Sequence, residues 1–186
     1  MKVAILSMQQ VKNYGSFLQA YSLKHNIELL GHTCDFINIV PGEQLGAYKI
    51  SKFHKIKLLI QRLVGIDFIK RLKTIKRFQM RFSREFLPEL GVKPGENKKH
   101  YDVVVVGSDE VFNCAQVTWF GFSRQLFGAG LNADKVISYA GSFGATTIEK
   151  LRELGIKDVV ANLLSKMDKI SIRDANSFDM VKVLTG

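Results

Sequence analysis

The run Asp102-Val103-Val104-Val105-Val106-Gly107-Ser108-Asp109 decides the fold of this chain. Its four consecutive valines are apolar on both faces of a strand, which suits a strand that is covered by helices on each side. A glycine and polar residues follow at once, at the point where the strand ends. Ligands of a parallel sheet bind beyond the carboxyl ends of its strands. The run therefore predicts an α/β protein whose function resides in the loops after the strands.

Strand and helix patterns alternate on both sides of this run. Toward the amino terminus, a short apolar strand, a helix ended by Gly31 and a second strand ended by Pro41-Gly42 form a βαβ unit, whose crossover is expected to be right-handed. Together the elements predict a Rossmann-like parallel sheet with helices on both faces. The predicted strands are 3–6, 36–40, 103–106, 136–140 and 169–172, and the predicted helices are 17–30, one or two within 148–167, and 176–184.

Length and composition are those of a globular protein. With 186 residues, 46% of them apolar, and only three prolines, the chain is neither a disordered tail nor a collagen-like repeat nor a low-complexity linker. Cys34 and Cys114 are 80 residues apart without a CxxC pair or a Cys/His cluster, so neither a zinc site nor a disulfide framework is predicted. We expect two buried thiols, with a reactive nucleophile as the alternative. The four histidines form no ligand-spaced cluster, and no metal site is predicted.

The positive charge is concentrated in one segment. The chain has 27 Lys and Arg against 17 Asp and Glu, a net charge of +10, and residues 49–84 hold twelve of these bases with a single acid, Asp67. Apolar residues at helical spacing predict two amphipathic helices here, about 56–63 and 67–82, and Pro88 is expected to end the second. Residues 49–88 are therefore predicted to be a basic helical insertion between the second and third strands.

Two interpretations of the insertion stay open. Basic residues opposite a stripe of Phe, Leu and Ile suit a peripheral contact of residues 49–84 with an anionic membrane. Alternatively, the apolar stripes pack on the sheet or on another domain, and the bases are simply solvated. Nucleic acid is not expected as a partner, because the Phe residues fall on the apolar side of the helices rather than among the bases.

The sequence predicts a cytoplasmic protein. The apolar run Val3 to Leu6 at the amino terminus is too short for a signal peptide. No uncharged stretch exceeds 13 residues, whereas a membrane-spanning helix needs about 18 or more.

The loop after the first strand is a candidate anion site. Asn13-Tyr14-Gly15-Ser16 leads directly into the helix that carries Gln19. Gly15 allows a close backbone approach, and the free N–H groups at a helix start favour phosphate or carboxylate. A turn followed by a helix N-cap is the alternative interpretation. The chain contains neither GxGxxG nor GxxxxGK[ST], so the dinucleotide-binding and P-loop classes lack their defining residues.

The loop after the third strand carries the most polar candidates. Gly107, Ser108, Asp109 and Asn113 offer a glycine, a hydroxyl, a carboxylate and an amide that suit sugar hydroxyls, and Asp109 is placed to accept a proton from one of them. In the alternative interpretation, Ser108 or Asp109 caps the next turn.

The last two loops add a small-residue turn and a cation. Residues 138–144 place Ser142 between two glycines, with Tyr139 and Phe143 available for stacking on a sugar or for packing inside. Arg173 follows the fifth predicted strand and suits a carboxylate or phosphate ligand, or else an ion pair with Asp174 or Asp109.

Taken in this order, the four loops resemble the polysaccharide pyruvyl transferase family. The residues that carry the resemblance are Asn13-Tyr14-Gly15-Ser16 with Leu18-Gln19-Ala20-Tyr21, Val106-Gly107-Ser108-Asp109 with Asn113, the run 138–144, and Ile170-Ser171-Ile172-Arg173. The resemblance implies an enzyme that moves the enolpyruvyl group of phosphoenolpyruvate to sugar hydroxyls as a ketal. Its acceptors are cell-surface polysaccharides or their lipid-linked precursors, and it uses no cofactor besides this donor substrate.

The resemblance also implies roles for individual residues. Asp109 is expected to deprotonate the sugar hydroxyl, and Arg173 to support the donor electrostatically or to hold Asp109. Two positions depart from the family pattern, because Glu110 and Phe112 stand where Gln and Trp are usual, and the loss of the indole suggests a different acceptor preference. The expected substrate-binding residues are Asn13, Tyr14, Gly15, Ser16, Gln19, Gly107, Ser108, Asn113 and Ser142.

The family architecture resembles that of two-domain, GT-B-like glycosyltransferases, with two Rossmann-like halves facing a cleft. We expect residues 1–186 to be the N-terminal half, with the C-terminal domain outside this chain. Two alternatives remain open. One is a truncated, non-catalytic domain that binds a sugar or a protein partner, and the other is the N-terminal domain of a nucleotide-sugar glycosyltransferase.

Overall fold

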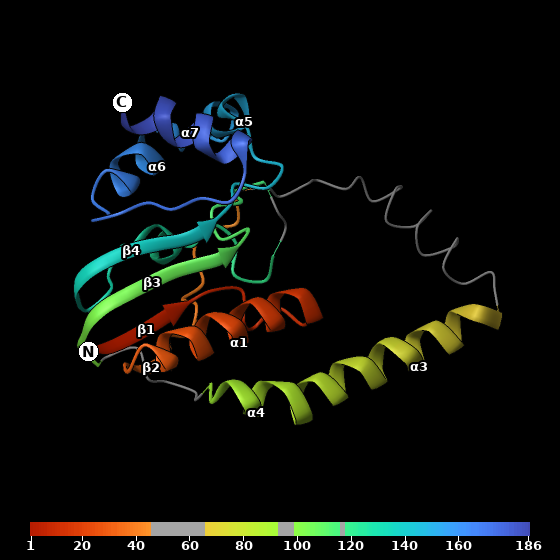
Figure 1. Ribbon diagram of the computed structural model, residues 1–186. Helices are drawn as coiled ribbons and strands as arrows, with labels where there is room; N and C mark the ends of the chain where they lie inside the picture. Colours follow the sequence, from red (N-terminus) through yellow and green to blue (C-terminus); the bar gives the residue numbers. More distant parts are fainter. Residues whose placement is uncertain (46–65, 93–98, 116–117) are drawn as a thin grey trace.

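The centre of the protein is a four-stranded sheet in the order β2-β1-β3-β4 (Figure 1). The computed structural model describes residues 1–45, 66–92, 99–115 and 118–186. Each neighbouring pair of strands is parallel, which confirms the predicted α/β class. The strands are β1 (Lys2–Leu6), β2 (Thr33–Phe36), β3 (Tyr101–Asp109) and β4 (Ala133–Gly141).

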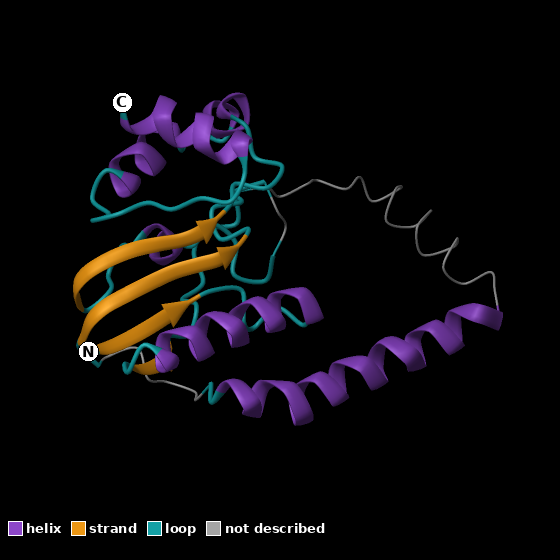
Figure 2. Ribbon diagram, in the orientation of Figure 1, coloured by secondary structure: helices purple, strands orange, loops and turns teal. Residues whose placement is uncertain are grey.

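Helices cover both faces of this sheet (Figure 2). Successive residues of a strand point to opposite faces, so Val103 and Val105 pack with α1 (Tyr14–Leu29). Val104 and Val106 pack on the other face, with α5 (Ile148–Glu153), α6 (Lys157–Leu164), α7 (Ala175–Thr185) and the 3₁₀ helix η2 (Arg124–Phe127). The run of four valines is therefore covered on both sides, as its composition predicted.

The second strand lies earlier in the chain than predicted. β2 ends at Phe36, and the last ladder hydrogen bond beside it runs from Ile37 N to Ile5 O, at 2.9 Å. Beyond this point, side chains take over the backbone groups. Gln9 Nε2 donates to Ile37 O at 2.7 Å, and Val40 N donates to Gln125 Oε1 at 2.8 Å. The prediction of a strand over 36–40 was wrong because these tertiary contacts replace a strand partner.

The fifth predicted strand, 169–172, is not a strand. The segment runs beside β4 and is joined to it by two isolated bridges, which pair Lys169 with Ile137 and Ile172 with Gly141, and by backbone hydrogen bonds such as the one from Ser138 N to Lys169 O at 2.9 Å. Between the bridges, Ser138 Oγ donates to Ser171 O and accepts from Ser171 N, both at 3.0 Å. Residues 138–140 of β4 face only residues 170–171 of the segment, so the register shifts by one residue between the bridges and no continuous ladder forms. The segment nevertheless brings Arg173 to the carboxyl edge of the sheet.

The second helix of the basic insertion forms and is longer than predicted, while the first, 56–63, lies outside the described residues. Helix α3 (Ile66–Arg81) continues through a π-helical turn, η1 (Phe82–Phe86), into α4 (Leu87–Leu90). Pro88 does not end the helix, because it lies in the first turn of α4, where an N–H group is dispensable. The helix ends instead at Gly91, whose φ of 68° suits a glycine C-cap.

The aromatic side of α3 and η1 packs on α1. Phe78 and Phe86 meet the ring of Tyr14 edge-on, with centroids 5.1 and 5.2 Å apart, and Phe86 also meets Phe17 at 5.1 Å. Phe82 lies among them and is 0% exposed. For this part of the insertion, the packing interpretation is confirmed. None of the helices in the described ranges is both long enough and apolar enough to cross a membrane.

Candidate functional site

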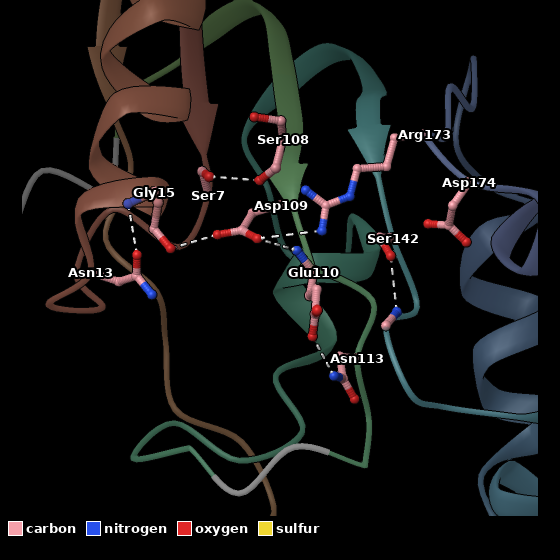
Figure 3. A network of polar contacts seen from close by, with 12 residues as sticks. Ser7, Asn13, Gly15, Ser108, Asp109, Glu110, Asn113, Ser142, Arg173 and Asp174 are labelled. Atoms are coloured by element: carbon pink, nitrogen blue, oxygen red, sulfur yellow. Dashed lines mark hydrogen bonds and ion pairs between the residues drawn. The ribbon is translucent and has the colours of Figure 1, made fainter.

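The candidate site is a polar network around Asp109 at the carboxyl edge of the sheet (Figure 3). Asp109 Oδ2 accepts a hydrogen bond from Ser16 Oγ at 2.6 Å, and Asp109 Oδ1 accepts one from the backbone N–H of Glu110 at 2.9 Å. A guanidinium nitrogen of Arg173 lies 3.7 Å from Oδ1. The network therefore joins the start of α1, the end of β3 and the segment beside β4, three of the four loops that the sequence singled out.

The end of β3 is shaped to hold Asp109 in place. Gly107 has a φ of 123°, and a Cβ atom at this position would collide with the carbonyl oxygen of Tyr139. Ser7 Oγ donates to Ser108 O at 2.9 Å, and Ser142 N donates to Asp109 O at 3.0 Å. Residues of the loops after β1 and β4 thus hydrogen bond to the backbone carbonyls of Ser108 and Asp109 and hold the turn in place. The collision that a Cβ atom would cause explains why residue 107, ahead of the polar residues, is a glycine.

The loop before α1 acts first as a helix cap. Asn13 is the N-cap of α1, and its Oδ1 accepts from Gly15 N at 2.7 Å, so the capping interpretation is confirmed. The ring of Tyr14 is engaged with the phenylalanines of α3 and η1. Ser16, which is buried, is the residue of this loop that hydrogen bonds to Asp109. The substrate-binding roles of these four residues stay predictions.

The side chains of Asn113 and Ser142 contact loop residues next to Asp109 rather than its carboxylate. Asn113 Nδ2 donates to Glu110 Oε2 at 2.7 Å, and Asn113 Oδ1 accepts from Thr146 Oγ1 at 2.9 Å. Ser142 Oγ accepts from Gly144 N at 2.9 Å. These contacts order the loops after β3 and β4. The direct substrate contacts predicted for Asn113 and Ser142 stay predictions.

A cleft of about 420 Å³ opens between α1 and the ends of β3 and β4. Three predicted residues line it, Gln19, Ser108 and Arg173. Gln19 Oε1 is buried and has no hydrogen-bond partner among the described residues. The Arg173 side chain is 34% exposed. The cleft therefore offers a guanidinium, a hydroxyl and an amide, a set that suits an anionic ligand with hydroxyl groups.

Other lining residues were missed by sequence reasoning. Ser22 and Asn26 follow Gln19 at helical spacing and continue its polar row along α1, a periodicity that was visible in the sequence.

Tyr139 lines the cleft and is 53% exposed, whereas Phe143 is fully buried. The alternatives of stacking and packing that the sequence left open for both aromatics are thus resolved toward packing for Phe143.

Arg173 and Asp174 have different structural roles. Of the two ion pairs considered from the sequence, the Arg173–Asp109 pair is formed. Asp174 is the N-cap of α7, and its carboxylate accepts from Ser177 N at 2.8 Å and from Ser177 Oγ at 3.0 Å. Burial acts to raise the pKa of Asp174, but hydrogen bonds from Ser142 and Ser177 outweigh it and lower the pKa below its ordinary value.

A cluster of metal-ligand residue types lies at the opposite, amino edge of the sheet. Ligand atoms of His100, Asp102 and Asp134 lie within 4.8 Å of one another. His100 Nε2 is 3.0 Å from Asp134 Oδ1, and Asp102 Oδ2 accepts from Lys2 N at 2.7 Å. Sequence reasoning missed the cluster because Asp134 comes from the neighbouring strand. Because each of the three side chains already has a partner within the protein, we assign no metal ion to the cluster.

Comparison with known proteins shows the family of this chain. The family model for polysaccharide pyruvyl transferases matches residues 13–185, a span that includes Asn13, Asp109 and Arg173. The chain belongs to the polysaccharide pyruvyl transferase family. The family is one of transferases, which supports an enzymatic role for this pyruvyl transferase homologue. Searches of the curated proteins and of the solved structures returned no match.

Proposed function

We propose that this protein transfers the enolpyruvyl group of phosphoenolpyruvate to sugar hydroxyls of a cell-surface polysaccharide or its lipid-linked precursor. The observation that carries the proposal is the position of Arg173 in a cleft beside Ser108 and Gln19, with Asp109 behind it. A guanidinium binds the carboxylate or phosphate of such a donor well. The reaction takes place in the cytoplasm, where the donor is available, and uses no cofactor.

The transfer balances without a redox partner. Two hydroxyls of one sugar form bonds to C2 of the donor, and the bond between C2 and the phosphate oxygen breaks. Of the two hydroxyl protons, one goes to C3, which becomes a methyl group, and the other leaves with inorganic phosphate. The product is a cyclic ketal that carries a carboxylate. The site must therefore hold two negative groups of the donor close to the hydroxyls of a sugar.

The geometry favours a positioning role for Asp109 over the predicted role as a base. Both of its carboxylate oxygens already accept hydrogen bonds, one from Ser16 and one from Glu110 N. Ser108 and Arg173 line the cleft, whereas Asp109, which contacts Arg173 from behind, is not among its lining residues. In this assignment, Asp109 orients Arg173, and Arg173 contacts the donor. Gln19 and Ser108 then bind acceptor hydroxyls.

A second Rossmann-like half would complete the site. Leu18 and Tyr139 line the cleft and are 58% and 53% exposed, which leaves apolar surface at its rim. We propose that a C-terminal domain covers this rim in a GT-B-like arrangement, as the family resemblance implies, and that residues 1–186 contribute the wall with α1 and Arg173.

The proposal is tested by donor binding and turnover in matched arginine variants. We expect phosphoenolpyruvate to bind the protein in calorimetry and to release phosphate when a sugar acceptor is added. Arg173→Gln should weaken donor binding at least about tenfold, the range expected when a charged hydrogen-bonding partner is removed. Arg124→Gln is the control, because Arg124 pairs with Glu43 at 3.3 Å and does not line this cleft.

Three outcomes would overturn this function. Equal donor affinity in both arginine variants would remove Arg173 from the site. Binding of a nucleotide-diphosphate sugar in place of phosphoenolpyruvate would favour a glycosyltransferase. Binding of sugar without phosphate release, in a protein that also carries the C-terminal domain, would favour a non-catalytic binding domain.

A further inference from the structure

Helix α3 presents two different faces. One face carries Phe78, which with the following Phe82 and Phe86 packs on Tyr14 and Phe17 of α1. An apolar stripe that is used in this way does not face a membrane. The part of this face that packs on α1 is not available to a partner, whereas the outer face, opposite the phenylalanines, is available.

The outer face carries basic residues and no acid. Residues 72–84 contain five Lys and Arg and no acid. At about 100° per residue, Lys73, Lys76 and Arg77 fall within an arc of about 100°, on the side opposite Phe78 and Phe82. All three are exposed. Among the described residues, one acid forms an ion pair with this part of the helix. It is Glu85, whose carboxylate lies 2.7 Å from Arg81 Nε.

Apolar side chains are placed among these bases. Met80 falls in the middle of the same arc and is 50% exposed, and Leu72 lies about 40° beyond its edge and is 48% exposed. Helix α3 also extends past the end of α1, away from the sheet (Figure 1), and each of the residues 72–77 is exposed. A flat surface can therefore reach this face without displacing α1.

We propose that the outer face of α3 docks on an anionic lipid bilayer. The outer face is defined here as Leu72, Lys73, Lys76, Arg77 and Met80. Its cations match the anionic headgroups in charge, and each basic residue near such a surface strengthens binding by about fivefold. Met80 and Leu72 lie where they can enter the acyl boundary between the headgroups. A nucleic acid would gain little from an exposed methionine among the cations, so the lipid surface is the better partner. The inference stands apart from the proposed reaction.

The experiment compares vesicles with and without anionic lipid. We expect the protein to sediment with vesicles of phosphatidylcholine and phosphatidylglycerol, and not with phosphatidylcholine alone. The triple variant Lys73→Gln, Lys76→Gln and Arg77→Gln should weaken binding about 100-fold, as three factors of about five multiply. Added salt should weaken the wild type in the same direction.

A control variant with the same net charge separates the outer face from the overall charge. Lys166→Gln, Lys169→Gln and Lys182→Gln remove three exposed lysines from another part of the chain. This control should bind within about threefold of the wild type. Met80→Gln, which changes no charge, should weaken binding several-fold if the side chain enters the bilayer. Unfolding in urea checks that each variant keeps the fold.

The lipid assignment is overturned by any of three results. These are the absence of binding to the anionic vesicles, an equal loss of binding in the two triple variants, and tighter binding to single-stranded RNA than to vesicles.

Discussion

Replacing Asp109 by Asn tests the centre of the candidate site. Asn keeps the shape of the side chain and tolerates the φ of 93° at this position, which would strain most other replacements. Its amide oxygen can still accept from Glu110 N, and the Ser16 hydroxyl can turn to accept from its amide nitrogen. The substitution therefore removes the charge and retains both hydrogen bonds as neutral ones.

The expected loss of stability follows from these contacts. Hydrogen bonds to a charged group contribute about 1.5–3 kcal/mol and neutral ones about 1, so the change of type costs about 0.5–2 kcal/mol for each of the two bonds, or about 1–4 kcal/mol together. The ion pair with Arg173 spans 3.7 Å and is partly exposed, so its loss adds only about 0.5 kcal/mol. We expect the free energy of unfolding of Asp109→Asn to fall by about 1.5–4.5 kcal/mol, and the affinity for phosphoenolpyruvate to fall as Arg173 loses its orientation.

Urea unfolding and calorimetric titration with phosphoenolpyruvate measure the two effects. Asp134→Asn is the control, because Asp134 is 64% exposed and pairs with His100 at the opposite edge of the sheet, so it should cost less than about 0.5 kcal/mol. If Asp109→Asn left both stability and donor affinity unchanged, the network would have no energetic role. A kcat at least 100-fold lower with an unchanged KM would instead show that Asp109 is the base.

The remaining predictions concern the fold around the site. Gly107→Ala should destabilise the protein by about 2 kcal/mol or more, because its methyl group meets the Tyr139 carbonyl; a urea midpoint equal to the wild type would contradict this. Phe82→Ala should cost about 3–5 kcal/mol in the same assay, since the ring is 0% exposed, and a cost below about 1 would mean that the helix does not pack on α1. Because the folded pKa of Asp174 is lowered, its stabilisation is present above about pH 4 and is lost as the pH falls through the folded value. Between about pH 5 and about pH 2, Asp174→Asn should therefore lose less stability than the wild type, and equal losses would refute the cap. Burial raises the pKa of Cys34 and of Cys114 to about 12, but only Cys34 is buried and Cys114 is half-buried. Cys34 should therefore react with a disulfide reagent only after unfolding, and its rapid labelling in the native protein at pH 8, roughly the ordinary thiol pKa, would count against burial.

Features that depend on neighbours in the chain were predictable. The valines 103–106 indicated a strand covered on both faces, and Gly31 marked the end of the first helix. Helical spacing likewise indicated α6 and α7. The loops after the strands carried the family resemblance, and the family model confirmed it. In each case, the signal is a local composition or period, which the sequence contains in full.

Features that depend on distant residues were not predictable. Ser16 and Asp109 are 93 residues apart, and Ser138 and Ser171 are 33 apart, yet their hydrogen bonds join the segments that form the site. The chain by itself determined the α/β class, the polar loops and their family. Only the tertiary structure decided that Asp109 faces Ser16 and Arg173, and that α3 turns its phenylalanines inward and its bases outward. The reason is that a strand or helix period is set by adjacent residues, whereas the partner of a side chain is set by how separate elements pack.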